Sequence, residues 1–256
     1  MLTDLPQNNF KRALAAGKQQ IGLWLSLTSP VATEIVAGAG YDWVLIDMEH
    51  SANDLPEVAH HLHACEGGTA EPVVRVPWNE PVLVKRLLDL GARSLLFPFV
   101  QSAAEAKRAV EATRYPPRGI RGVAVATRAN RYGRVPDYQK RADGEICVLV
   151  QVETRQAMAD IEAMAAIDGI DGIFIGPSDL AASLGHTGNP QHPDVQGAIM
   201  EAGARIRKAG KAAGYLSGRD DEIRKTLDAG FGFVAIGSDV ALLARNAEAL
   251  VQKYRN

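Results

Sequence analysis

Two carboxylates and an imidazole follow directly on an apolar run in this chain. Residues 43–48 read Trp-Val-Leu-Ile-Asp-Met, and Glu49 and His50 come next. Ionisable groups at the end of a buried strand are costly unless they are paired or take part in chemistry. With Asp47 and Glu49 close in sequence to His50, a carboxylate can fix the imidazole tautomer and raise its basicity, which predicts proton transfer here. The alternative is a hydrogen-bonded structural histidine.

Polar side chains also end two later apolar runs. Arg75 lies in the short sequence Val-Arg-Val-Pro, where an unpaired charge would be expensive. It either pairs with Asp47 or Glu49, or supplies a fixed positive charge for a substrate carboxylate or a developing oxyanion. Gln151 and Glu153 are two residues apart, so both side chains share one face of a strand.

Glu153 and Asp179 are candidate ligands of a divalent metal ion. They are 26 residues apart, one strand–helix unit, which predicts adjacent strands about 4.8 Å apart. Two carboxylates at neighbouring strand ends repel each other unless a hard cation lies between them. The alternatives are a salt bridge from Glu153 to Arg155 or to an arginine of the 115–142 loop, and a helix N-cap role for Asp179. The chain has no Cys/His cluster with zinc spacing, which favours magnesium, manganese or a similar ion.

These residues lie on a regular alternation of apolar strands and amphipathic helices. A short helix over 8–16 precedes it. The predicted strands are 21–27, 43–48, 72–76, 94–100, 146–152, 172–175, 213–216 and 233–236. The predicted helices are 30–39, 55–65, 81–90, 103–113, 155–166, 195–209, 220–229 and 241–253.

Eight strand–helix units in 256 residues, with no low-complexity linker, favour one α/β domain over 1–256. We predict a single (β/α)8 TIM barrel, whose chemistry lies at the carboxyl ends of the strands. A doubly wound sheet is the second interpretation. The 115–142 loop is predicted to be functional or, alternatively, a solvated insertion.

Composition excludes several classes of function. The net charge of −2, without a basic block, argues against a nucleic-acid-binding surface. No apolar run is long enough for a membrane span. No signal peptide is predicted from the polar first 20 residues. Cys65 and Cys147 are expected to be buried thiols of a cytoplasmic protein. His60, His61 and His63 are expected to be exposed on the 55–65 helix.

The chain resembles the HpcH/HpaI family of metal-dependent (class II) pyruvate aldolases, which serve aromatic and sugar-acid catabolism. The resemblance covers nearly the whole chain in collinear order. The matching pieces are residues 22–24 (GLW), 47–50 (DMEH), 75–79 (RVPWN), 115–122 (YPPRGIRG), 151–154 (QVET), 174–180 (FIGPSDL) and 188–193 (GNPQHP).

The resemblance implies that Glu153 and Asp179 bind Mg²⁺, Mn²⁺ or Co²⁺, with no organic cofactor. It implies that Arg75 stabilises the enolate oxygen of pyruvate, and that His50, oriented by Asp47, transfers protons.

The resemblance also implies a substrate pocket and an oligomer. Asp89 would reach His50 of a neighbouring subunit, in a homohexamer with exchanged C-terminal helices. The implied substrate-binding residues are Trp24, Val123, Ala124, Val125, Gln151, Gly176, Ser178 and Leu216. The sequence departs from the family pattern in the 123–128 segment, which is one residue shorter, and at Ser178, where alanine is expected.

The predicted reaction is the reversible, divalent-metal-dependent aldol cleavage of 4-hydroxy-2-oxo acids to pyruvate and an aldehyde. A Schiff-base mechanism is disfavoured because no lysine lies at a predicted carboxyl strand end. The alternatives are a citryl- or malyl-CoA type carbon–carbon lyase on a related barrel and a metabolite-binding barrel without catalysis.

Overall fold

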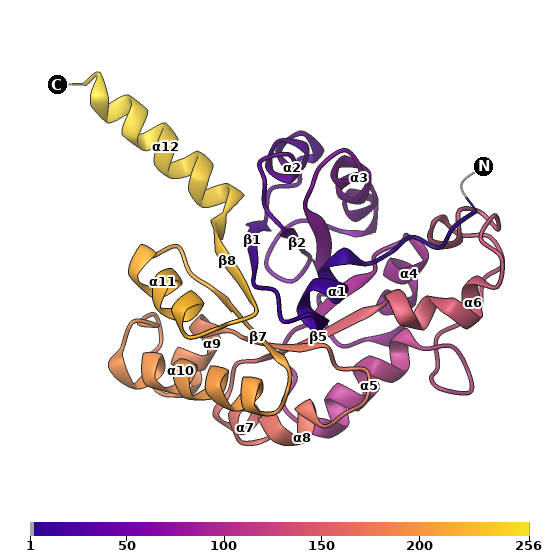
Figure 1. Cartoon of the computed structure of the whole chain (residues 1–256). Helices are drawn as coiled ribbons and strands as arrows, with labels where there is room; N and C mark the ends of the chain where they lie inside the picture. Colours follow the sequence, from indigo (N-terminus) through magenta and orange to yellow (C-terminus); the bar gives the residue numbers. More distant parts are fainter. Residues whose placement is uncertain (1–2, 256) are drawn as a thin grey trace.

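The computed structural model describes residues 3–255. In it the eight predicted strands close into a parallel barrel and follow one another in the order of the sequence (Figure 1). Each strand pairs with the next, and β1 also pairs with β8, which rules out the doubly wound sheet. The strands are β1 (Gln20–Leu25), β2 (Trp43–Asp47), β3 (Glu71–Arg75), β4 (Ser94–Phe97), β5 (Cys147–Val152), β6 (Gly172–Ile175), β7 (Ala212–Leu216) and β8 (Phe233–Ser238).

Most of the helices surround this barrel, and the predicted ones lie mostly within a few residues of their expected bounds. They are α1 (Asn9–Ala15), α2 (Pro30–Ala37), α3 (Leu55–Cys65), α4 (Pro81–Asp89), α5 (Ala103–Thr113), α6 (Tyr138–Arg141), α7 (Arg155–Ala159), α8 (Ile161–Ala165), α9 (Pro177–Ser183), α10 (Pro193–Lys208), α11 (Asp220–Asp228) and α12 (Asp239–Lys253), with 3₁₀ turns η1 (Arg128–Asn130) and η2 (Ala142–Glu145). None of the described helices combines the length and apolarity needed to cross a membrane.

The predicted helix 155–166 is broken in two. Asp160 has non-helical backbone angles between α7 and α8. Its carboxylate accepts a hydrogen bond 2.5 Å long from the backbone N–H of Ala103. A tertiary contact therefore replaces the continuous helix that the apolar pattern predicts.

Helix α1 closes the amino end of the barrel. Phe10 is fully buried, with its ring 5.6 Å from Trp43 and 5.8 Å from Phe233. Asn8 caps the helix by accepting from the backbone N–H of Lys11. Aromatic side chains thus plug this end, where the buried polar groups Asn8 and Ser94 bond each other, and the ionisable groups of the site lie at the carboxyl end.

Alternation along the strands aims the polar residues inward. Trp43 and Leu45 of β2 belong to the apolar cluster inside the barrel, whereas the residues between and after them pack outward against the helices. The period of two therefore places Asp47 on the inner face. Leu45 pairs with the inner residue Val73 of β3, and Asp47 pairs with Arg75. Arg75 consequently lies beside Asp47 in the last layer of the barrel.

The segment between α5 and β5 is ordered rather than a solvated insertion. It contains η1, α6 and η2 and encloses an apolar cluster of its own, made of Tyr115, Ala129, Val135, Tyr138 and Ala142. The guanidinium of Arg121 is fully buried there, 4.5 Å from the centre of the Tyr115 ring.

Candidate active site at the carboxyl ends of the strands

A forked ion pair joins β2 to β3 at the mouth of the barrel. Arg75 donates from Nε to Asp47 Oδ1 over 2.8 Å and from Nη2 to Oδ2 over 2.7 Å. Both side chains are buried, with 8% and 2% of their surface exposed. Asp47 also accepts from the indole Nε1 of Trp24 over 3.3 Å, and the guanidinium carbon lies 5.0 Å from that ring's centre. The guanidinium is thus fixed by two charge-assisted bonds and a cation–π contact.

The carboxylate of Asp47 is held ionised. Burial alone would raise its pKa, but the hydrogen bonds and charge of Arg75 lower the pKa below its usual value. The backbone N–H groups of Glu49 and His50 add to this effect by donating to Oδ1 over 3.0 and 3.4 Å. Asp47 therefore organises the turn that follows β2.

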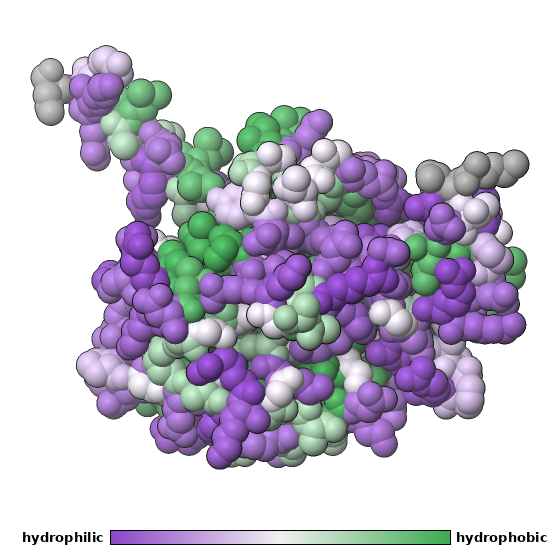
Figure 2. Space-filling view, viewed as in Figure 1, coloured by the Kyte–Doolittle hydropathy of each residue, from purple (hydrophilic) through white to green (hydrophobic). Residues whose placement is uncertain are grey.

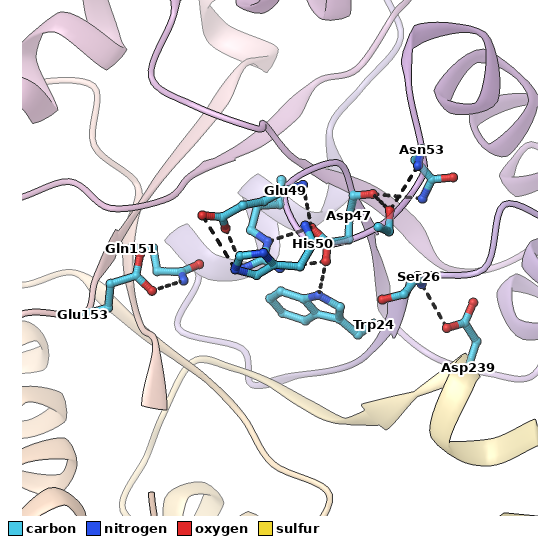
Figure 3. A network of polar contacts seen from close by, with 11 residues as sticks. Trp24, Ser26, Asp47, Glu49, His50, Asn53, Gln151, Glu153 and Asp239 are labelled. Atoms are coloured by element: carbon cyan, nitrogen blue, oxygen red, sulfur yellow. Dashed lines mark hydrogen bonds and ion pairs between the residues drawn. The ribbon is translucent and has the colours of Figure 1, made fainter. Parts of the chain in front are cut away.

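Glu49 lies between the two halves of the site. In Figure 3 its carboxylate lies between Asp47 and His50 on one side and the Gln151–Glu153 pair on the other. Its Oε2 atom is 2.8 Å from Arg75 Nη1, an ion-pair distance without hydrogen-bond geometry. Burial raises the pKa of Glu49 to about 7, opposed by Arg75 and assisted by the charges of Asp47 and Asp179.

The imidazole of His50 projects into solvent at the rim. Its side chain is 66% exposed, and Nε2 lies 3.9 Å from Oε1 of Glu49. The contact from Asp47 reaches the backbone N–H of His50 rather than the ring. Glu49, which the sequence offered only as a partner of Arg75, is the nearest carboxylate to this ring, whereas Asp47 fixes the main chain beneath it.

Glu153 lies just beyond β5 and is 2% exposed. Its Oε2 accepts a 2.6 Å hydrogen bond from Gln151 Nε2, and its Oε1 accepts a 2.7 Å bond from the backbone N–H of Phe99. Burial raises the pKa of Glu153 to about 7; these bonds act against the shift, and Asp179 and Glu49 add to it. The predicted shared face of Gln151 and Glu153 is thus confirmed.

Asp179 occupies the first turn of α9, directly after β6, which pairs with β5. Gly176 is the N-cap residue of that helix, so Asp179 does not serve as the cap. A side chain at position 176 would overlap the carboxylate of Glu153, so only glycine lets the chain pass this close. The predicted adjacency of the Glu153 and Asp179 strands is confirmed.

The carboxyl end of the barrel carries more negative than positive charge. Arg75 compensates Asp47 and Glu49, but within residues 3–255 no lysine, arginine or histidine forms an ion pair with Glu153 or Asp179. The carbonyl Oε1 of Gln151 is also buried without a hydrogen-bond donor. Uncompensated carboxylate and carbonyl oxygens are the donor set that a hard divalent cation prefers, so these residues fit such an ion.

A buried histidine supports the turn after β2 from below. Asn53 donates from Nδ2 to the backbone carbonyl of Asp47 over 2.9 Å. Its Oδ1 lies 2.9 Å from His61 Nε2, and His61 Nδ1 lies 2.6 Å from the hydroxyl of Thr33 on α2. These contacts assign the proton to Nε2 of a neutral ring, and burial lowers the pKa of His61.

The expectation that His61 is exposed on α3 was wrong, because the ring is completely buried. The apolar positions of α3 show why. Val58, His61, Leu62 and Cys65 are spaced i, i+3, i+4 and i+7, which is one face of a helix.

Five other predicted site residues form no hydrogen bond or ion pair with Asp47, Arg75 or Glu153 within residues 3–255. Asp89 forms an ion pair with Arg121, Oδ1 to Nη2 at 3.0 Å, and this is its one ion pair within residues 3–255. Val123 and Val125 are 65% and 82% exposed on the segment after Arg121. Leu216 ends β7 and packs against the inner cluster, and Ser178 is exposed in the first turn of α9.

A closed parallel barrel with an arginine, a histidine and several carboxylates at its carboxyl end has the architecture of a TIM-barrel enzyme. Comparisons with known proteins agree with this class. The sequence profile of the HpcH/HpaI aldolase/citrate lyase family matches residues 20–246. The chain is 54% identical to a protein of Klebsiella pneumoniae named 4-hydroxy-2-oxo-heptane-1,7-dioate aldolase, over 96% of this chain and 94% of that one.

A protein of Rhizobium etli named pyruvate aldolase is 52% identical over 98% of this chain and 99% of its own length. Among solved structures, a HpcH/HpaI aldolase/citrate lyase family protein from Burkholderia cenocepacia superimposes with a TM-score of 0.94 at 43% identity, covering 98% of this chain and all of that one. The chain belongs to the HpcH/HpaI aldolase/citrate lyase family, and the predicted class of carbon–carbon lyase is confirmed.

Proposed function

We propose that this protein catalyses the reversible, divalent-metal-dependent cleavage of 4-hydroxy-2-oxo acids to pyruvate and an aldehyde. The observation that carries the proposal is the placing of two carboxylates, the buried Glu153 just after β5 and the exposed Asp179 in the first turn of α9, at the end of the barrel that also holds the fixed guanidinium of Arg75. The names of the relatives from Klebsiella and Rhizobium support aldol chemistry with pyruvate.

Glu153 and Asp179 are the residues that would hold Mg²⁺, Mn²⁺ or Co²⁺. Such an ion, when bound, polarises the 2-oxo group and stabilises the negative charge that develops as the bond between C3 and C4 breaks. Gln151 orients Glu153 through its hydrogen bond, and its carbonyl oxygen is buried without a donor. A side chain at Gly176 would displace the carboxylate of Glu153, so the glycine keeps this ligand in place. Gly176 and Ser178 would bind the substrate carboxylate.

Arg75 stabilises the enolate oxygen in this proposal. Its fork to Asp47 uses two of the five N–H groups of the guanidinium, so donors are left for a substrate oxygen. Because Asp47 and Trp24 fix the group before substrate arrives, little reorganisation is needed as charge develops.

His50 removes the proton from the C4 hydroxyl in the cleavage direction and returns it in the synthetic direction. Its exposure at the rim suits a group that exchanges protons with solvent. Glu49, within ion-pair range of the ring, would stabilise the imidazolium form. Asp89 of a neighbouring copy would complete this proton-transfer group, and Val123, Ala124, Val125, Trp24 and Leu216 would line the aldehyde pocket.

The C-terminal helix supports a homo-oligomer, for which we propose a hexamer with exchanged helices. Helix α12 projects away from the barrel instead of covering β1 and β8 (Figure 1). Its apolar side chains Leu243 and Leu250 are 62% and 60% exposed, and Val31 and Ile35 of α2 are also exposed to solvent. Figure 2 shows both apolar surfaces. Exchange of α12 between copies would bury them together. The two buried free thiols support a cytoplasmic location.

Pyruvate release provides the test. Protein treated with EDTA should lose activity on 4-hydroxy-2-oxo acids, the first being 4-hydroxy-2-oxo-heptane-1,7-dioate, and recover it with Mn²⁺ or Mg²⁺. Citryl- and malyl-CoA serve as competing substrates, and His50→Ala is the test of catalysis itself. Full activity after complete metal removal, faster turnover of a CoA thioester, or a His50→Ala variant as active as the wild type would each refute the proposal.

A further inference from the structure

Two histidines and an aspartate meet outside the barrel, in the segment that joins α9 to α10. The rings of His186 and His192 stack with their centres 3.5 Å apart and their planes at 14°. Asp194, in the first turn of α10, turns its carboxylate toward both rings. The side chains of His186 and His192 are 26% and 33% exposed and that of Asp194 is 74% exposed, so the cluster is accessible to solvent.

The distances within the cluster are close to those of a metal site. Asp194 Oδ2 lies 3.5 Å from Nε2 of His186 and 3.7 Å from Nδ1 of His192, and the three atoms all lie within 4.8 Å of one another. Around a tetrahedral zinc ion with bonds of about 2.0–2.1 Å, neighbouring ligand atoms are about 3.3 Å apart. Small movements would therefore bring all three atoms to one ion.

The backbone of the segment is already ordered for this purpose. The N–H of His186 donates to the carbonyl of Ala181 over 2.8 Å. The N–H of Asn189 donates to the carbonyl of His186 over 2.9 Å, and that of His192 donates to Asn189 over 3.1 Å. Consecutive turns thus hold the two histidines together, and a metal ion would not have to order this loop on binding.

Two adjustments accompany metal binding. Parallel rings cannot both direct a lone pair at one ion between them, so one imidazole must turn about its χ2 torsion, which is a soft coordinate. The Nδ1 atom of His192 also accepts a 3.2 Å hydrogen bond from the N–H of Asp194 as the cap of α10. A metal ion would take the lone pair of His192 Nδ1, and the backbone N–H of Asp194 would then bond to water instead.

We propose that His186, His192 and Asp194 form a second metal site that binds Zn²⁺ or a similar transition metal ion. Two imidazoles and one carboxylate, with a fourth position open to water, suit Zn²⁺, Ni²⁺ or Cu²⁺ better than Mg²⁺. The Glu153–Asp179 site offers oxygen ligands alone and favours hard ions. Ion type therefore separates the two sites, and this proposal does not depend on the proposed reaction.

A bound ion would link the end of α9 to the start of α10. Asp179 lies in the first turn of α9, seven residues before His186 along the chain. Zinc at this position would hold the helix that carries Asp179 against α10, and would stabilise the folded chain in proportion to its occupancy.

Zinc stoichiometry of the full-length chain without a polyhistidine tag gives the test. After dialysis against micromolar Zn²⁺, we expect the wild-type chain to hold one more ion than His186→Ala. The same difference of one ion should separate a Glu153→Gln/Asp179→Asn variant from that variant with His186→Ala added. His60→Ala, which removes an exposed histidine of α3, is the matched control and should keep the wild-type count.

Two further measurements keep the test decisive if the carboxylate variant does not fold. Wild-type protein should show a zinc-dependent rise in Tm that His186→Ala abolishes and His60→Ala retains. Bound Cu²⁺ should show coupling to two imidazole nitrogens, reduced to one in His186→Ala. Zinc binding unchanged by His186→Ala, or lost in His60→Ala, would overturn the assignment.

Discussion

The forked pair between Arg75 and Asp47 gives a prediction whose size follows from burial. Replacing Arg75 by methionine keeps much of the side-chain volume but leaves the carboxylate of Asp47 buried and without its cation. Breaking a buried pair in this way costs about 3–5 kcal/mol. With an unfolding entropy of about 2.1 cal/mol/K per residue, the 256-residue chain should lose about 6–9 °C in Tm.

The loss should depend on pH in a defined direction. The pKa of Asp47 is below its usual value in the folded wild type, so the pair stabilises the fold at neutral pH and ceases to do so as the pH falls through that pKa. In Arg75→Met, burial is no longer opposed, so Asp47 takes up a proton at acidic pH. The difference in Tm between wild type and variant should therefore be larger at pH 8 than at pH 5.

Thermal unfolding at fixed protein concentration with EDTA present measures this difference. The matched control is Arg75→Met/Asp47→Asn, in which the buried charge is removed together with its partner, and it should recover much of the lost Tm. A Tm drop below 2 °C for Arg75→Met, or a drop that grows toward pH 5, would refute the argument that Asp47 depends on this guanidinium.

Two other predictions concern His61 and Glu153. His61→Leu leaves the hydroxyl of Thr33 and the amide oxygen of Asn53 buried without partners, at a cost of about 1–3 kcal/mol each, whereas His61→Gln can replace both bonds. Urea unfolding should therefore show that the leucine variant is less stable than the glutamine variant. Equal stabilities would contradict the assigned bonds. Binding of Mn²⁺ must displace the proton from Glu153, whose pKa is about 7. The Mn²⁺ affinity measured by calorimetry should therefore rise with pH up to about pH 7. Below that pH it should weaken by up to about tenfold per pH unit. An affinity that is constant from pH 5.5 to 8 would exclude this linkage, and Glu153→Gln should bind Mn²⁺ weakly at every pH.

Alternation along the strands explains why much of the site was predictable. Residues two apart share a face, so Asp47, Arg75 and Gln151 are placed by the apolar residues that precede them on β2, β3 and β5. Adjacent strands in sequence are adjacent in the barrel, which brings Glu153 next to the start of α9 and Asp179. Local pattern and topology suffice for these positions.

Contacts between distant segments account for what the sequence did not predict. The burial of His61 depends on the approach of α2, which brings Thr33 to its ring. The break at Asp160 arises from a bond to Ala103, 57 residues away. Such pairings are decided by packing in three dimensions.

The turn after β2 is anchored at both of its ends to rigid parts of the molecule. The carbonyl of Asp47 accepts from the hydroxyl of Ser51 and from Asn53, and Asn53 is in turn held by α3 through His61. The conformational entropy of this turn is therefore lost during folding rather than in each catalytic cycle. Substitutions that loosen the packing of α2 on α3 should slow turnover while sparing the affinity for metal, because they restore that entropy to the turn carrying His50 and leave β5 and β6 unchanged.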